Sequence, residues 1–250
     1  MSVLVVTSVS GAPGATTTAL GLAQQWGRQV LLVDADPVGG AAILAGHYQG
    51  RVANPGTLVE LWMAQRQGRL GEALSESALR MGELLDFIPG PAGAAQAASL
   101  TGLWPALAIE LKRLESLNID VIVDYGRLGH AWSATPLLRM ADQVLVVMRS
   151  DLVSVAGAAA MEPDMTEAPV GLVVIGNGGY GPGAIAKALN HLVEIELPWS
   201  PHEAAALIAA TPAGKSGVLR RSPQRLTRRL RTAAEGLQWR AEQQLEELNV

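Results

Sequence analysis

Short runs of apolar, mostly β-branched residues alternate along this chain with longer amphipathic segments. Seven of the runs are predicted to be strands, at residues 3–6, 30–33, 84–88, 121–123, 144–147, 170–175 and 193–197. Most are apolar at nearly every position, which is typical of strands buried on both faces of a parallel sheet. Segments between them, such as 103–117 and 182–192, have helical spacing. The pattern predicts an α/β fold with a doubly wound, mainly parallel sheet and helices on both faces.

A Gly-rich turn joins the first predicted strand to a predicted helix at residues 16–26. In a strand–turn–helix unit of this kind, backbone N–H groups and the positive end of the helix dipole can hold phosphate. The expected phosphate-binding residues are consecutive: Ser10, Gly11, Ala12, Pro13, Gly14, Ala15, Thr16 and Thr17. The lysine that precedes the Ser/Thr of a phosphate loop is absent, because Ala15 stands in its place.

Three aspartates are expected at the same edge of the sheet as this turn. Asp34 and Asp36 follow the second predicted strand, and Asp124 follows a later one. Nucleotide-bound Mg²⁺ takes one or two carboxylates, often through water, together with a Ser/Thr hydroxyl. Thr16, Asp34 and Asp124 are therefore the predicted magnesium residues. Two small-residue loops, 89–102 and 176–183, also follow predicted strands, on the side where α/β sheets bind ligands.

The composition excludes several kinds of site and partner. The chain has 250 residues, 49% of them hydrophobic and 17% charged, and we expect one domain spanning residues 1–250. It contains no cysteine, which excludes disulfides, thiolate metal sites and cysteine nucleophiles. The net charge of −4 gives no global attraction to nucleic acid, and no apolar run is long enough to cross a bilayer. We expect a cytoplasmic protein whose six tryptophans supply most of the aromatic core.

The C-terminal part changes in character. A helix is predicted at about residues 222–248, with Leu226, Leu230, Leu237 and Leu248 on the face that packs against the rest of the protein. Seven basic residues and no acidic ones lie between positions 215 and 231: Lys215, Arg220, Arg221, Arg225, Arg228, Arg229 and Arg231.

Taken together, the turn and the aspartates resemble the ParA/MinD class of P-loop ATPases, which is SIMIBI-like in fold. The resemblance is greater to the MinD-like proteins that include the CpaE/TadZ pilus-assembly branch. Residues 10–17 occupy the position of the family's deviant Walker A loop, Lys-Gly-Gly-x-Gly-Lys-Thr-Thr. Asp34-Ala35-Asp36-Pro37 matches its Asp-x-Asp-Pro, and Asp124 matches its Walker B position.

Later segments extend the resemblance over most of the chain. Residues 141–149 resemble a family strand, and residues 197–201 resemble the turn on the adenine side, with Ser200 in place of an Asp. The resemblance implies base contacts from Asn177 and Pro198. It also implies a homodimer and a protein partner in an assembly or partition system.

The departures from the family pattern concern catalysis. The resemblance implies that a lysine at position 15 grips the β- and γ-phosphates and that one at position 10 reaches the partner's phosphates. Here the two positions hold Ala15 and Ser10, and the second glycine is Ala12. Each lost charge-assisted hydrogen bond costs about 1.5–3 kcal/mol, or roughly ten- to a hundredfold in affinity.

Three functions follow as hypotheses. The first is a pseudo-ATPase that acts as a localisation, assembly or partition factor and binds ATP and Mg²⁺ weakly or not at all. The second is an active ATPase, with Asp36 and Asp124 as catalytic candidates and a cation from Arg127, Arg149 or a partner. The third is a module that binds DNA or a membrane surface through its basic helix, using Arg220, Arg221, Arg225, Arg228 and Arg229.

Overall fold

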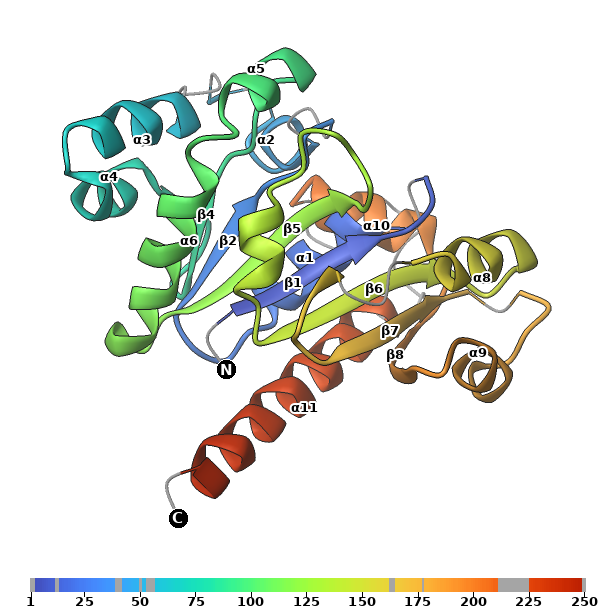
Figure 1. Cartoon of the computed structure of the whole chain (residues 1–250). Coiled ribbons are helices and arrows are strands. Elements are labelled where there is room, and N and C mark those ends of the chain that lie inside the picture. Colours follow the sequence, from blue (N-terminus) through green and yellow to red (C-terminus); the bar gives the residue numbers. More distant parts are fainter. Residues whose placement is uncertain are drawn as a thin grey trace.

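One sheet organises the structure (Figure 1). The computed structural model describes residues 3–11, 14–38, 42–49, 51–52, 57–161, 165–176, 178–210 and 225–248. Within them, eight strands lie in the order β3-β4-β2-β5-β1-β6-β7-β8. The strand bounds are β1 Val3–Ser8, β2 Val30–Asp34, β3 Leu79–Arg80, β4 Leu85–Ile88, β5 Asp120–Arg127, β6 Gln143–Arg149, β7 Val170–Ile175 and β8 Leu192–Leu197. All neighbouring pairs are parallel except β3 and β4.

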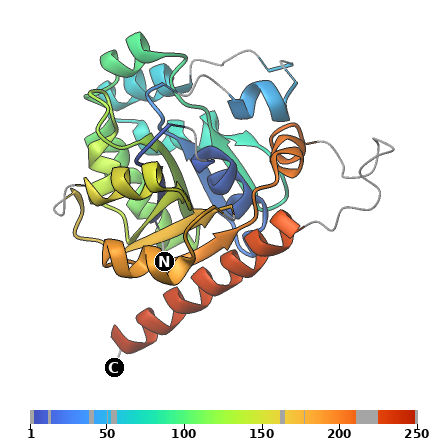
Figure 2. The same cartoon turned by 90° about the vertical axis from the view of Figure 1, so that its right-hand side faces the viewer.

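Helices cover both faces of the sheet (Figures 1 and 2). One face packs against α3 Thr57–Arg66, α4 Leu70–Ser77, α6 Trp104–Arg113, α7 Thr135–Arg139, α8 Leu152–Ala159 and α9 Pro182–Leu189. The other packs against α1 Ala15–Gln24, α2 Ala42–His47, α10 Pro201–Ile208 and α11 Arg225–Leu248. The short helices α5 Ala94–Ser99 and η1 Leu114–Leu117 lie in connections. The expected doubly wound, mainly parallel α/β fold is confirmed.

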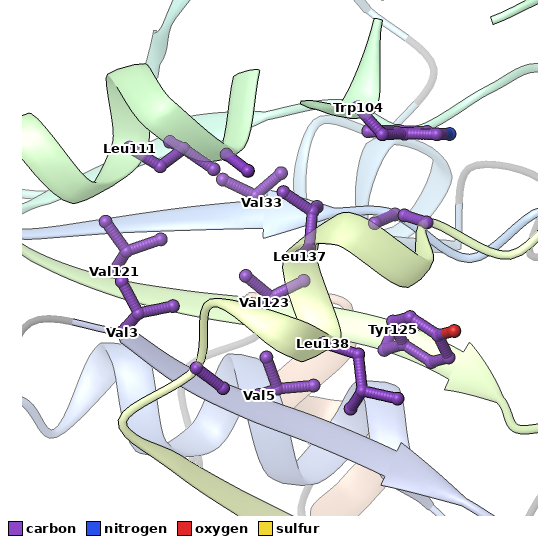
Figure 3. Close-up of a cluster of buried hydrophobic side chains, with 14 of the residues drawn as sticks. Val3, Val5, Val33, Trp104, Leu111, Val121, Val123, Tyr125, Leu137 and Leu138 are labelled. Carbon is purple, nitrogen blue, oxygen red and sulfur yellow. The ribbon is translucent and has the colours of Figure 1, made fainter. Parts of the chain in front are cut away.

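Strand alternation between the two faces produces two hydrophobic layers. Val3, Val5, Val121 and Val123 point to the face covered by α6 and α7, where they meet Trp104, Leu111, Leu137 and Leu138 (Figure 3). Leu4, Val6 and Ile122 point to the opposite layer, under α1 and α11. Because both faces are buried, the central strands are apolar at nearly every position, which is why they could be recognised in the sequence.

The C-terminal helix lies along the layer under α1 (Figure 2). Leu226, Leu230 and Leu237 are buried as predicted, and Ala234 and Ala241 continue the same stripe. The structure describes no side chain for Leu248, so that part of the prediction lies outside it. Since this apolar face packs against the protein's own core, it is not available to a membrane in this arrangement.

Polar contacts hold the C-terminal half of α11 and the start of β5 in place. Trp26 Nε1 donates to Asp120 Oδ2 at 2.8 Å, and Arg28 pairs with the same oxygen at 2.9 Å. Arg28 also reaches Glu242 of α11 at 3.5 Å, and Arg240 pairs with Glu194 of β8 at 2.8 Å. Burial raises the pKa of Asp120, and the Trp26 hydrogen bond followed by the Arg28 charge offsets part of that rise.

We expect Trp26→Phe to lower the free energy of unfolding by about 1–2 kcal/mol, because Asp120 would lose a buried hydrogen bond. Trp239→Phe is the matched control, since Trp239 is 61% exposed and should change stability by less than about 0.5 kcal/mol. Urea unfolding followed by circular dichroism measures both. Equal midpoints for the two variants would contradict this role for Trp26.

Several sequence expectations need correction. All seven predicted strands are present, but the two-residue β3 was missed. Residues 89–102 contain helix α5 rather than only a loop, because a run of alanines favours a helix. The helix expected at 182–192 ends at Leu189, and β8 begins at Leu192. The tryptophan expectation is only partly right: Trp26 and Trp104 are buried, whereas Trp132, Trp199 and Trp239 are exposed. No helix in the described ranges is long and apolar enough to span a membrane.

Candidate functional site

The Gly-rich turn leaves the sheet at its topological switch point. β1 lies between β5 and β6, and the turn connects the end of β1 to α1. Gly14 has φ +109°, a conformation that favours glycine, and its carbonyl accepts the Thr18 N–H at 2.9 Å. Ligands of doubly wound sheets sit at such a point, outside the carboxyl ends of the strands. Ala12 and Pro13 lie outside the described residues.

The position of the missing lysine lies at the start of α1. Ala15 is the first residue of that helix and is only 6% exposed. The described part of the chain contains Lys112 on α6 and Lys187 on α9, both on the sheet face opposite α1. Neither replaces an ammonium at position 15. Ser10, at the other lysine position, lies beside α8, where a Cβ on Gly157 would be 4.0 Å from Ser10 Cβ.

The structure brings the three predicted aspartates together. Asp34 and Asp124 are register partners on β2 and β5, and they are 5% and 1% exposed. The Asp36 N–H donates to Asp34 Oδ1 at 3.1 Å, and the Val38 N–H donates to Asp36 Oδ1 at 2.8 Å. The segment after β2 therefore folds back around its own carboxylates.

Burial and the charges of neighbouring aspartates shift the pKa values of two of these carboxyls. Burial, followed by the charge of Asp124, raises the pKa of Asp34 well above its ordinary value. Burial also raises the pKa of Asp124 to about 6, although the nearby Thr16 hydroxyl opposes that rise. Neither carboxylate has an ion-pair partner among the described residues. The pair is therefore poised to gain from a cation.

A magnesium ion fits the chemistry of this group. Among the described residues, Asp124 Oδ2 is fully buried and has no hydrogen-bond partner, and the Thr16 hydroxyl lies near that carboxylate. In the described ranges, no three His, Cys, Asp or Glu side chains are placed to hold a metal by themselves. Mg²⁺ retains water and shares its coordination with phosphate, so it does not require such a cage. The residues that would hold it are Thr16, Asp34 and Asp124.

Two glycines make room for the carboxylates. A Cβ on Gly90 would lie 2.6 Å from Asp34 Cγ, and a Cβ on Gly126 would collide with the Asp36 carboxylate. Gly126 also has φ +73°, and its carbonyl accepts the Thr7 hydroxyl at 3.0 Å. The register of β1 and β5 shifts beside it, between Val6 and Thr7. This irregularity positions the end of β5 next to the loop.

We expect Gly126→Ala to destabilise the protein by about 1–2 kcal/mol more than Gly129→Ala, because only its new methyl group would displace Asp36. Gly129 is a close control: it has φ +76°, and a Cβ there would meet nothing within 4 Å. Both variants carry the same left-handed strain, so the difference isolates the carboxylate contact. Chemical denaturation measures it, and equal losses would show that Asp36 is not held by this glycine.

An apolar cavity of about 220 Å³ lies beside the loop. Three parts of the chain line the cavity. The Gly-rich turn and α1 contribute Gly14, Thr17 and Thr18, and the turn after β8 contributes Pro198, Trp199 and Ser200. The start of α11 contributes Leu226 and Leu230. Pro198, which the sequence predicted as a base contact, lines this cavity next to the Gly-rich turn. The other predicted base contact, Asn177, lies outside the described residues.

The two candidate arginines lie at the same edge of the sheet. Arg127 ends β5 and is exposed. Arg149 ends β6, and its guanidinium carbon lies 4.0 Å from the centre of the Trp199 ring. Arg149 and Trp199 together line a second, smaller hollow with Ser150, Asp151 and Gly178.

The basic residues of the C-terminal helix project from its outer side. Arg225, Arg228 and Arg229 are exposed and form none of the ion pairs found among the described residues. Arg231 is engaged with Gln25, to which it donates at 3.1 Å. Arg220 and Arg221 lie outside the described residues.

Sequence reasoning missed part of the cavity wall. Thr18 lines the cavity, and its hydroxyl is buried without a hydrogen-bond partner among the described residues. Leu226 and Leu230 were recognised as core residues but not as neighbours of the loop, because nothing local in the sequence places the start of α11 there. Trp199 belongs to the turn that the sequence predicted at residues 197–201, but its inclusion in the aromatic core was wrong, because it is 52% exposed.

Comparison with known proteins gives structural but not sequence relatives. No protein-family model and no curated protein sequence matches the chain. A ParA family ATPase from Chlorobium tepidum superposes with a TM-score of 0.71 at 18% identity, covering 93% of this chain and 98% of the other. A chain of the MinC:MinD cell division protein complex of Aquifex aeolicus gives a TM-score of 0.69 at 18% identity, with 95% and 96% coverage. The septum site-determining protein MinD of Pyrococcus horikoshii, complexed with Mg-ADP, gives 0.68 at 15% identity, with 94% and 95% coverage.

These superpositions extend over nearly the whole length of each protein. At such low identity they establish the architecture alone. The chain has the fold of the ParA and MinD ATPases.

Proposed function

We propose that this protein is a ParA/MinD-like localisation, assembly or partition factor of the cytoplasm that binds magnesium nucleotide weakly and does not hydrolyse it. The observation that carries this proposal is a buried Ala15 at the start of α1 in a protein that keeps the paired carboxylates Asp34 and Asp124. The part of the site that holds a metal is retained, while the part that grips and activates phosphate is lost.

Retained groups support binding. The backbone around Gly14 and the start of α1 can direct N–H groups at phosphate, and Thr16 with Asp124 can hold Mg²⁺ when the nucleotide supplies the remaining ligands. The apolar cavity next to Thr17 and Pro198 can enclose a base. A magnesium ion would supply positive charge to the phosphates and relieve the repulsion between Asp34 and Asp124.

The absence of lysine at positions 10 and 15 argues against ATP hydrolysis. Phosphoryl transfer depends on positive charge that is already positioned where negative charge develops. Positions 10 and 15 supply none. The alternative of an active ATPase needs Arg127 or Arg149 instead, yet Arg149 is stacked on Trp199 at 4.0 Å. An arginine already engaged in a cation–π contact would have to leave it before it could reach phosphate.

A protein partner or a second copy is expected to bind at the same edge of the sheet. Leu152 and Val153 at the start of α8 are 64% and 77% exposed, and α8 lies beside Ser10. Exposed apolar side chains next to a ligand site are suited to an interface that responds to the ligand. The A. aeolicus structure is a MinC:MinD complex, which supports a partner of this general kind.

Calorimetry with ATP and Mg²⁺ tests the binding part of the proposal. We expect weak binding, with a dissociation constant in the high-micromolar to millimolar range, that requires Mg²⁺ and is lost in Asp124→Asn. Asp86→Asn is the control, because Asp86 is a partly exposed aspartate of β4 that pairs with Arg80, away from the loop. The absence of any heat at millimolar nucleotide would refute nucleotide binding by the isolated protein.

A second candidate function is non-specific binding of DNA through α11. It is favoured by the exposed Arg225, Arg228 and Arg229, which have no ion-pair partner among the described residues. Such binding should weaken steeply with salt and should be lost when the three arginines are replaced by glutamine. Unchanged DNA mobility at low salt would eliminate this candidate.

A further inference from the structure

The apolar cavity has the start of the C-terminal helix as one of its walls. Leu226 and Leu230 line it from α11, opposite Gly14, Thr17 and Thr18. Both leucines are at most 5% exposed, so they belong to the core as well as to the cavity. A molecule that fills the cavity would therefore pack against the first two turns of α11.

Glu203 ties the same two turns to the turn after β8. One carboxylate oxygen, Oε2, accepts the Leu226 N–H at 2.9 Å, and the other, Oε1, accepts the Ser200 hydroxyl at 2.9 Å. N–H groups in the first turn of a helix have no partner within it, so this contact from α10 satisfies one of them. Because Ser200 lines the cavity, the cavity wall and the helix start share one anchor.

Close packing against α1 links α11 to the phosphate loop. Leu230 fills the space in which a Cβ on Gly21 would lie, so that glycine lets the two helices approach. Since α1 begins at the loop, the loop, α1 and the first turns of α11 form one packed unit around the cavity. The far end of α11 is held separately, through Arg28 and Arg240.

We propose that filling this cavity determines how firmly the first two turns of α11, residues 225–232, are held against the protein. For Mg·ATP as the occupant, the inference rests on the nucleotide binding proposed above. Arg225, Arg228 and Arg229 leave these same turns, so their positive charges become fixed in place when the cavity is filled. By linkage, a helix start that is held more firmly binds the occupant more tightly.

Hydrogen exchange measured by mass spectrometry tests the coupling. With saturating Mg·ATP, we expect amides in residues 225–232 to exchange about tenfold more slowly, while residues 238–244 at the far end of α11 stay unchanged. Calorimetry on the same sample reports binding independently. Binding heat without any slowing at residues 225–232 would overturn the coupling while leaving the proposed function intact.

A larger side chain that fills the cavity tests the coupling without nucleotide. Ala204 lines the cavity from α10, whereas its neighbour Ala205 is exposed. Ala204→Leu should slow exchange in residues 225–232 with no ligand present and should weaken Mg·ATP binding, while Ala205→Leu should do neither. If calorimetry detects no nucleotide binding, the proposed function fails and this pair of variants still decides the coupling. Unchanged exchange in Ala204→Leu would overturn it.

Removing the Glu203 side chain, which anchors both the cavity wall and the helix start, should loosen the start of α11. Glu203→Ala should speed exchange in residues 225–232 by about tenfold and weaken Mg·ATP binding several-fold. The control is Glu72→Ala, which removes a glutamate from the first turn of α4, away from the cavity. Thermal melting of both variants verifies that they remain folded. Faster exchange in Glu203→Ala with unchanged nucleotide affinity would contradict the linkage.

Discussion

Ala15→Lys is expected to raise the affinity for Mg·ATP by about ten- to a hundredfold, because it returns a charge-assisted contact to the bound phosphates. The new side chain would leave the start of α1 next to Thr16, whose hydroxyl lies near the buried Asp124 carboxylate. That carboxylate has no ion-pair partner among the described residues, so the added charge meets an environment that favours it.

Ala15→Met is the matched control, since it adds a side chain of similar length without charge. Because Ala15 is buried, both substitutions place a long side chain in a confined position at the start of α1. Comparing the two variants therefore removes the steric effect that they share. Calorimetry with ATP, with and without Mg²⁺, measures the effect. Equal affinities in the two variants would show that this loop does not hold the phosphates.

Acidification from pH 7 to pH 4 is expected to stabilise the wild type relative to Asp124→Asn by about 2.5 kcal/mol, in the absence of Mg²⁺. Burial raises the pKa of Asp124 from 3.8 to about 6 in the folded protein. Between these two values the folded state binds more protons than the unfolded state. The stabilisation is therefore present in full below about pH 4 and is lost as the pH rises through about 6.

Asp34 adds to the difference in the same direction through the Asp124 charge, which helps to raise the pKa of Asp34 in the wild type and is absent from Asp124→Asn; the larger effect of burial on Asp34 is common to both proteins. Urea unfolding at several pH values between 4 and 8 measures the difference in free energy of unfolding between the two proteins. The other titratable groups are present in both proteins, so their contributions largely cancel. Added Mg²⁺ at pH 7 should recover part of the loss in the wild type only. A difference that does not change with pH would contradict the placement of Asp124 as a buried, unpaired carboxylate.

Most of the fold could be predicted because the chain signals it locally. β1, β2 and β6 are buried on both faces, so their apolar runs are uninterrupted. The missed strand, β3, has two residues, Leu79 and Arg80, and exists only by pairing with β4. No periodicity can develop over so short a length. Helix α5 was missed for a different reason, because its small residues are also common in loops.

The candidate site was only half visible in the sequence. Asp34, Asp124 and Thr16 follow strand ends and a Gly-rich turn, so parallel pairing brings them together. The cavity wall from Leu226 and Leu230 depends on how a helix from the other end of the chain packs on α1. The orphan hydroxyl of Thr18 and the Glu203 anchor likewise arise from tertiary packing, which no local pattern records.

Phosphate release from ATP by the purified wild-type protein, compared with Asp124→Asn, tests the central claim most directly. If the loop binds nucleotide but lacks the charge needed for transfer, the two proteins should release phosphate at the same background rate with Mg²⁺ present. Robust Mg²⁺-dependent release by the wild type that Asp124→Asn abolishes would contradict the account and establish an active ATPase.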